Sequence, residues 1–149
     1  MAIYDEVIRN EMRSRIINYA NIFTEDDFKF ENRNFNPENR RLWISEAWIG
    51  GDEEVYTNRR TQMPTAIVQY DIYAKENTGT MEAGTAAHAI EDEFSILSPI
   101  KSRIVIPNFP NMDVVVYKTG LSTRKESPWF VQIIVLYLRI IQLCEWPSG

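Results

Sequence analysis

The segment from Trp129 to Leu143 constrains the fold most, because both of its alternating faces are apolar. One face carries Trp129, Val131, Ile133, Val135, Tyr137, Ile141 and Leu143; the other carries Phe130, Ile134, Leu136, Leu138 and Ile140. Two apolar faces are typical of a strand in the middle of a sheet. The apolar run also contains Gln132, Arg139 and Gln142 and is shorter than the ~18 to 20 residues that span a bilayer. We therefore expect a long central strand with a bulge or bend, and no membrane span.

Two further segments have apolar residues at the spacing of an amphipathic helix. The first covers residues 2 to about 23, with a stripe at Ile8, Met12, Ile16, Tyr19 and Phe23. The second starts after Asn77-Thr78-Gly79-Thr80, ends at Pro99 and has a stripe at Ala83, Ala86, Ala87, Ile90, Phe94 and Leu97. The alanines predict close packing on a sheet. The opposite side is predicted to face solvent and carries Gly84, His88, Glu91, Asp92 and Ser95.

The remaining pattern consists of strands and turns. Residues 41–49 alternate with aromatic side chains on both faces, and residues 65–74 have one clearly apolar face. A short strand at 28–30 and strands at 102–106 and 113–118 complete the set, with turns marked by Gly50-Gly51, Pro107, Pro110 and Gly120. This order predicts one α+β domain over residues 1–149: a largely antiparallel or mixed β-sheet with two α-helices packed on one face.

Composition excludes several classes of function. Lys and Arg number 16 against 21 Asp and Glu, and a net charge of −5 disfavours tight nucleic-acid binding. Such a charge suits a passage through which DNA slides without sticking. The single cysteine, Cys144, excludes an intramolecular disulfide framework. The first residues lack the basic end and apolar run of a signal peptide, so we expect a soluble, cytoplasmic protein.

No catalytic constellation stands out in the sequence. The only histidine, His88, falls on the polar side of the second predicted helix without metal-ligand partners, and Cys144 ends an apolar strand as a buried thiol would. Adjacent acids at Asp26-Asp27, Glu53-Glu54 and Glu91 to Glu93 are typical of solvated surfaces. Neither glycine-containing turn matches a phosphate loop. We predict no catalytic residue, no metal, no cofactor and no enzymatic activity.

Surface residues are the remaining candidates for function. Ile3, Val7 and Ile17 fall off the stripe of the first helix, which fits extra burial in the same subunit and contact with another subunit equally well. Separated charge patches would set the register of a head-to-tail contact, although simple solvation explains each pair as well. The full set of candidate interface residues is Ile3, Val7, Ile17, Arg40, Arg41, Asp52, Glu53, Glu54, Tyr56, Arg59, Arg60 and Met63.

The layout as a whole resembles a known family. The matching features are the helix at Ile3-Tyr4-Asp5-Glu6-Val7-Ile8, the strand at Leu42-Trp43-Ile44, Pro64 leading into Ile67–Tyr73, and Gly79 before the alanine-rich helix. Over residues 2 to about 120 this order is similar to the tail terminator family of long-tailed bacteriophages (tail completion proteins). The likeness rests on pattern and order.

The resemblance implies a structural virion protein of the tail and neck, assembled in the host cytoplasm. Such a subunit forms a homo-oligomeric ring, a hexamer, on the last layer of the tail tube, ends polymerisation and presents a head-joining surface. Its partners would be the tail tube protein and the head–tail connector or neck proteins, with DNA passing through and no membrane involved. The resemblance also implies no cofactor, and it places the segment Gly50 to Met63 against neighbours or the tube.

Two alternatives remain open from the sequence. One is a neck or head-completion connector, which would bind the portal complex instead of the tube. The other is a small-ligand-binding or enzymatic α+β domain with a pocket between the second helix and the sheet, near Tyr70, Tyr73 and Tyr137.

Overall fold

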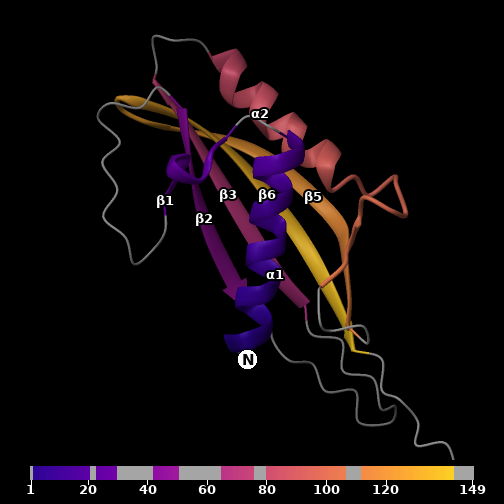
Figure 1. Cartoon of the computed structure of the whole chain (residues 1–149). Helices are drawn as coiled ribbons and strands as arrows, with labels where there is room; N and C mark the ends of the chain where they lie inside the picture. The colour runs from indigo at the N-terminus through magenta and orange to yellow at the C-terminus, as the bar shows by residue number, and fades with distance from the viewer. Residues whose placement is uncertain are drawn as a thin grey trace, which may run out of the picture.

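A computed structural model describes residues 2–20, 23–29, 42–50, 65–75, 80–106 and 112–142 (Figure 1). Two helices are found in these ranges, α1 (Ala2–Arg15), which continues into a π-helical turn (Ile16–Ala20), and α2 (Thr80–Glu93). A 3-10 turn (Glu25–Asp27) precedes the first strand. The strands are β1 (Phe28–Lys29), β2 (Leu42–Gly50), β3 (Thr65–Lys75), β4 (Arg103–Ile104), β5 (Met112–Glu126) and β6 (Trp129–Gln142).

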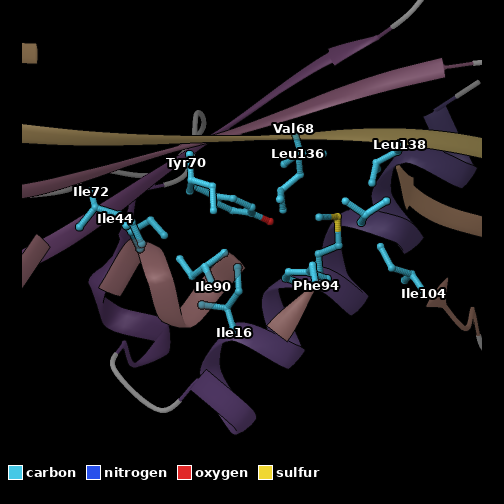
Figure 2. Close-up of a cluster of buried hydrophobic side chains, with 14 of the residues drawn as sticks. Ile16, Ile44, Val68, Tyr70, Ile72, Ile90, Phe94, Ile104, Leu136 and Leu138 are labelled. Atoms are coloured by element: carbon cyan, nitrogen blue, oxygen red, sulfur yellow. The ribbon is translucent and has the colours of Figure 1, made fainter. Parts of the chain in front are cut away.

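The strands form one sheet in the order β1-β2-β3-β6-β5-β4. β1 runs parallel to β2, whereas the other neighbouring strands are antiparallel. Figure 2 shows α1 and α2 on the same side of the sheet, with the buried side chains between them and the strands. The predicted fold class, an α+β domain with two helices packed on one face of a mixed sheet, is confirmed.

The central position of β6 is also confirmed, because β6 pairs with β3 on one side and with β5 on the other. The bulge, however, lies in β5, between Val116 and Lys118. The turn predicted at Gly120 is wrong, since Gly120 is inside β5 opposite Val135. β6 offers hydrogen-bonding groups along its whole length, and this pairing outweighs the weak strand preference of one glycine. The hairpin turns instead at Ser127 and Pro128.

Each apolar stripe predicted from the sequence includes one residue that the structure exposes to solvent. Tyr19 is 72% exposed, because the wider π-helical turn rotates it away from the line of Ile8, Met12 and Ile16. Leu97 is 91% exposed, since α2 ends at Glu93 and the chain then bends away. The other predicted stripe residues within the described ranges are buried.

The core lies between the helices and the sheet. Ile90 of α2, Phe94 directly after α2, and Ile16 of the π-helical turn lie against Val68, Tyr70, Leu136 and Leu138 of the sheet (Figure 2). Ile8 and Met12 of α1 belong to the same buried cluster. Ala83, Ala86 and Ala87 are fully or almost fully buried, so their small side chains let α2 lie close to β3 and β6, as the sequence predicts. Burial of each large apolar side chain contributes roughly 1.5–3 kcal/mol.

A buried ion pair fastens α1 to the sheet. Glu46 of β2 faces the helices, and its side chain is 1% exposed. Arg9 Nε donates to Glu46 Oε1 at 2.8 Å, and Arg13 Nη2 donates to the same oxygen at 3.2 Å. Two arginines one helical turn apart thus compensate one carboxylate that the strand brings into an apolar layer.

Arg15 joins α1 to the end of α2 and to the segment that follows. Its Nε donates to Glu93 Oε1 at 3.2 Å, and Nη2 donates to the backbone oxygens of Glu93 at 2.6 Å and Lys101 at 2.9 Å. The guanidinium carbon lies 4.5 Å from the ring centroid of Phe94. These contacts satisfy carbonyl groups at the end of α2 and hold the chain where it turns toward β4.

Candidate interaction surface

The face of the sheet that points away from both helices is named the open face here. It consists of alternate residues of β2, β3, β6 and β5. The pairing of these strands aligns the residues in four rows: Trp43–Tyr73–Val131–Arg124, Ser45–Asp71–Ile133–Ser122, Ala47–Gln69–Val135–Gly120 and Ile49–Ile67–Tyr137–Lys118. Trp43 and Val131 are buried, and the others are half-buried or exposed. A solvated sheet face is usually polar, so the isoleucines, valine and aromatic residues in these rows mark a surface suited to contact.

An aromatic cluster occupies one end of the open face. The rings of Trp43 and Tyr73 stack with centroids 3.9 Å apart and an interplanar angle of 2°. Trp129 meets Trp43 edge-on at 5.8 Å and Tyr73 at 6.5 Å. Lys29 Nζ lies 5.9 Å from the Trp43 ring. The rings of Tyr73 and Trp129 contribute to the burial of Trp43 on this face.

Arg124 organises the charges beside this aromatic cluster. Its Nη2 donates to Tyr73 Oη at 3.1 Å, to Glu126 Oε2 at 3.1 Å and to Asp71 Oδ2 at 3.4 Å. Gln69 Nε2 donates to the other carboxylate oxygen of Asp71 at 2.8 Å. Partial burial, followed by the charges of Glu126 and Asp71, raises the pKa of Tyr73 above its usual value. The charges at this end are therefore largely balanced within the subunit.

The other end of the open face carries the tyrosine–cation patch, defined as Tyr117, Lys118, Tyr137 and Arg139. Tyr117 is the extra residue of the β5 bulge, and its ring centroid lies 6.2 Å from that of Tyr137. Arg139 lies over the Tyr117 ring at 4.9 Å, and Lys118 lies over the Tyr137 ring at 5.0 Å. Both cations are exposed. Within the described ranges neither forms an ion pair, in contrast to Arg124.

Few of the interface residues selected from the sequence fall in the described ranges. Val7 and Ile17 are partly buried against the core of the same subunit. Ile3 lies in α1, and nothing is described of its side chain. The other selected residues lie outside the described ranges: Arg40, Arg41, Asp52, Glu53, Glu54, Tyr56, Arg59, Arg60 and Met63. Their assignment to an interface stays a prediction.

The residues considered for chemistry are scattered in the structure. His88 is exposed on α2, where its Nδ1 lies 3.7 Å from Glu91 Oε1. Among the residues that the structure describes, no group of three or more His, Cys, Asp or Glu side chains is arranged to hold a metal ion. Cys144 lies outside the described residues. None of the described helices has the length and apolarity needed to cross a bilayer.

The tyrosines considered for a ligand pocket do not share one face of the sheet. Tyr70 is fully buried and points toward the helices, whereas Tyr73 and Tyr137 lie on the open face. Burial and the nearby Glu46 carboxylate raise the pKa of Tyr70 well above its usual value. The three side chains therefore cannot line a common pocket beneath α2.

Sequence reasoning missed the residues that define both ends of the open face. Alternation alone placed Ile67, Gln69, Asp71 and Tyr73 on one side of β3, but the partner of each residue on β6 depends on the strand register. Lys118 is the last residue of a predicted strand, but the turn predicted at Gly120 left Arg124 outside the predicted sheet. The segment from Lys118 to Glu126 is polar apart from Gly120 and Leu121, so it has no apolar alternation that predicts a strand.

Comparison with protein-family models finds no match, and neither does comparison with curated proteins. A solved structure is similar over almost the whole chain. It superposes with a TM-score of 0.62 at 14% sequence identity, and the match covers 97% of this chain and 98% of that chain. At this level of identity the likeness establishes that the complete α+β arrangement recurs in another protein of nearly the same extent.

Proposed function

We propose that this chain is a structural virion protein of the tail terminator type. In this role it forms a homo-oligomeric ring, a hexamer, at the head-proximal end of a phage tail and ends polymerisation of the tail tube. The ring presents the surface that joins the head, and DNA passes through it without sequence-specific binding. Its partners are further copies of itself, the tail tube protein and the connector or neck proteins. The proposed role requires neither catalysis nor a cofactor.

The open face is the observation that carries this proposal. Ile49, Ile67, Val135 and Tyr137 are half-buried or exposed on a sheet face that neither described helix covers. Subunit interfaces are enriched in tyrosine, tryptophan and arginine, and their centres are depleted of acidic residues. The open face combines these residue types with aliphatic side chains. A protein that acts by packing against copies of itself and against a tube requires such a surface.

The acidic composition supports the same role. A ring that encloses DNA must not bind the phosphate backbone strongly, and the chain has 21 acidic against 16 basic residues. The segment 95–105 adds a second exposed apolar region, since Leu97, Ile100 and Val105 are 91%, 84% and 71% exposed. Two different contact regions on one subunit are what a heterologous ring contact needs.

The test is the assembly state of the purified full-length protein, measured by light scattering and by negative-stain electron microscopy. We expect closed rings, formed by the protein alone or on addition of tail tube protein. A protein that stays monomeric in both conditions would contradict the proposal.

Phage particles that lack the protein separate the terminator from the neck alternative. Overlong tails without heads are expected if the chain ends tube polymerisation. Finished tails beside empty or leaking heads would instead identify a neck or head-completion connector. Pull-down with tube and portal proteins gives an independent measurement of the same distinction.

A further inference from the structure

We infer that the tyrosine–cation patch of one copy binds the acidic turn Glu25–Asp26 of the next copy. The inference rests on the proposed ring function, because it names the contact through which neighbouring subunits would associate. The occupant of the patch is thus a second copy of this chain, and charge complementarity between two described surfaces supports the pairing.

The patch has cations that its own subunit leaves available. Lys118 and Arg139 are held above the rings of Tyr137 and Tyr117 at 5.0 and 4.9 Å. Within the described ranges they make no ion pair, whereas Arg124 at the other end of the open face makes two. Contact with the rings limits the positions of the two flexible side chains, so less conformational entropy is lost when a carboxylate binds.

The acidic turn has carboxylates that, like the cations of the patch, are exposed and form no ion pair with a described residue. They belong to Glu25 and Asp26. Their backbone is fixed, because Thr24 N donates to Asp27 Oδ2 at 2.9 Å and Asp27 N donates to the Thr24 carbonyl at 3.0 Å. Asp27 is therefore used inside the turn, while the two acids before it remain available to a partner.

Buried aromatic residues anchor the turn on both sides. Phe23 and Phe28 pack edge-to-face with centroids 6.3 Å apart, and both belong to the core. A turn held at both ends presents Glu25 and Asp26 in a defined orientation. Such a preorganised element suits a contact that must repeat identically in every subunit of an assembly.

The two surfaces are too far apart to meet within one subunit. The acidic turn leads directly into β1, at one edge of the sheet, whereas the patch lies on β5 and β6. Phe28 of β1 is aligned across β2 and β3 with Gln132 of β6, three strand spacings away. Tyr137 lies five residues further along β6, so the separation from Phe28 to Tyr137 is roughly 20 Å. Pairing must therefore join two copies through different surfaces, and such heterologous contacts generate rings when the rotation closes.

Charge reversal of each surface, followed by a swap, tests the pairing in the full-length protein. The patch variant is Lys118→Glu with Arg139→Glu, and the turn variant is Glu25→Lys with Asp26→Lys. We expect each to weaken self-association about tenfold or more in sedimentation velocity, and to keep the melting temperature of the subunit. The variant with all four changes is expected to recover association. The control variant, Lys125→Glu with Lys101→Glu, changes the net charge as much as the patch variant does, at other exposed positions, and should leave association unchanged.

The outcomes separate this inference from the proposed function. Recovery of association in the four-residue swap supports direct pairing. Rings that survive both reversals overturn the pairing while the terminator proposal stands, and loss in both variants without recovery in the swap also overturns it. A wild-type protein that stays monomeric, alone and with tail tube protein, overturns the terminator proposal and the pairing together. If the patch variant loses binding only to the tube protein, the patch binds a different partner and the pairing is wrong.

Discussion

The two faces of the sheet are built from alternate residues of the same strands, yet they differ in what surrounds each side chain. On β6, Leu136 is fully buried beneath the helices, whereas its neighbour Val135 is half-buried on the open face. Both faces contain aliphatic, aromatic and charged residues, so residue type alone does not distinguish them. The helix-covered face is completed by its own subunit, and we propose that the open face is completed by another.

The largest expected difference between the faces concerns apolar packing. Leu136→Ala should lower the free energy of unfolding by about 2–5 kcal/mol, because it removes buried methyl groups and leaves a cavity. Val135→Ala, one residue away on the open face, should cost at most about 1 kcal/mol in the isolated subunit. Urea unfolding of both variants measures the difference. Equal losses would mean that the open face is packed as tightly as the core.

A smaller difference is expected for the charged residues of the two faces. Glu46→Gln should cost about 2–3 kcal/mol, since it removes the charge that compensates Arg9 and Arg13 in a buried setting. Asp71→Asn on the open face should cost less than about 1 kcal/mol, because its partner Arg124 has a side chain that is 42% exposed and the ion pair is weakened by solvent. Chemical unfolding at neutral pH compares them. A harmless Glu46→Gln change would exclude this ion pair as the tie between α1 and β2.

The smallest difference is expected at alkaline pH and involves the tyrosines of β3. The pKa of Tyr70 is raised well above its usual value of 10.0, so the folded state keeps this proton to higher pH than the unfolded state does. The stability gained is full below pH 10 and is lost as pH rises toward the folded pKa, by up to about 1.4 kcal/mol per pH unit. Tyr70→Phe should flatten this decline.

Tyr73→Phe is the matched control for the open face. The pKa of Tyr73 is also raised, in the same direction but in a more exposed position, so its replacement should change the alkaline decline less. Melting temperatures between pH 8 and pH 11 compare the two variants with wild type. A steeper effect of Tyr73→Phe would show that the open face, and not the core, controls alkaline stability.

The sequence predicts the helix-covered face well, because burial on that face is recorded in regular spacing. Ala83, Ala87 and Ile90 repeat at helical intervals, and the alternation in residues 129–143 identifies the central strand. The failures have local physical causes. The π-helical turn at Ile16–Ala20 exposes Tyr19, and strand pairing carries β5 through Gly120. Neither a wider helical turn nor a partner strand is visible in the periodicity of one segment.

The open face was harder to predict, because its clusters join residues far apart in the chain. Trp43, Tyr73 and Trp129 come from three strands, and Arg124 reaches Asp71 from a fourth. The charge pairs selected from the sequence lie in segments outside the described residues. The buried Glu46 shows the same limit: its side of β2 followed from alternation, but its arginine partners on α1 did not.

The bulge at Tyr117 decides which residues of β5 face the helices and which lie on the open face. Before it, the even-numbered Val114 and Val116 face the helices; after it, Thr119 does so and donates to Glu91 on α2. If Tyr117 paired in the ladder as an ordinary strand residue, strict alternation would turn Lys118 and Arg124 toward the helices; deleting Tyr117 would leave both on the open face. When related chains are aligned, a gap at this position would therefore remove one ring from the tyrosine–cation patch and keep the other residues of β5 on their present faces.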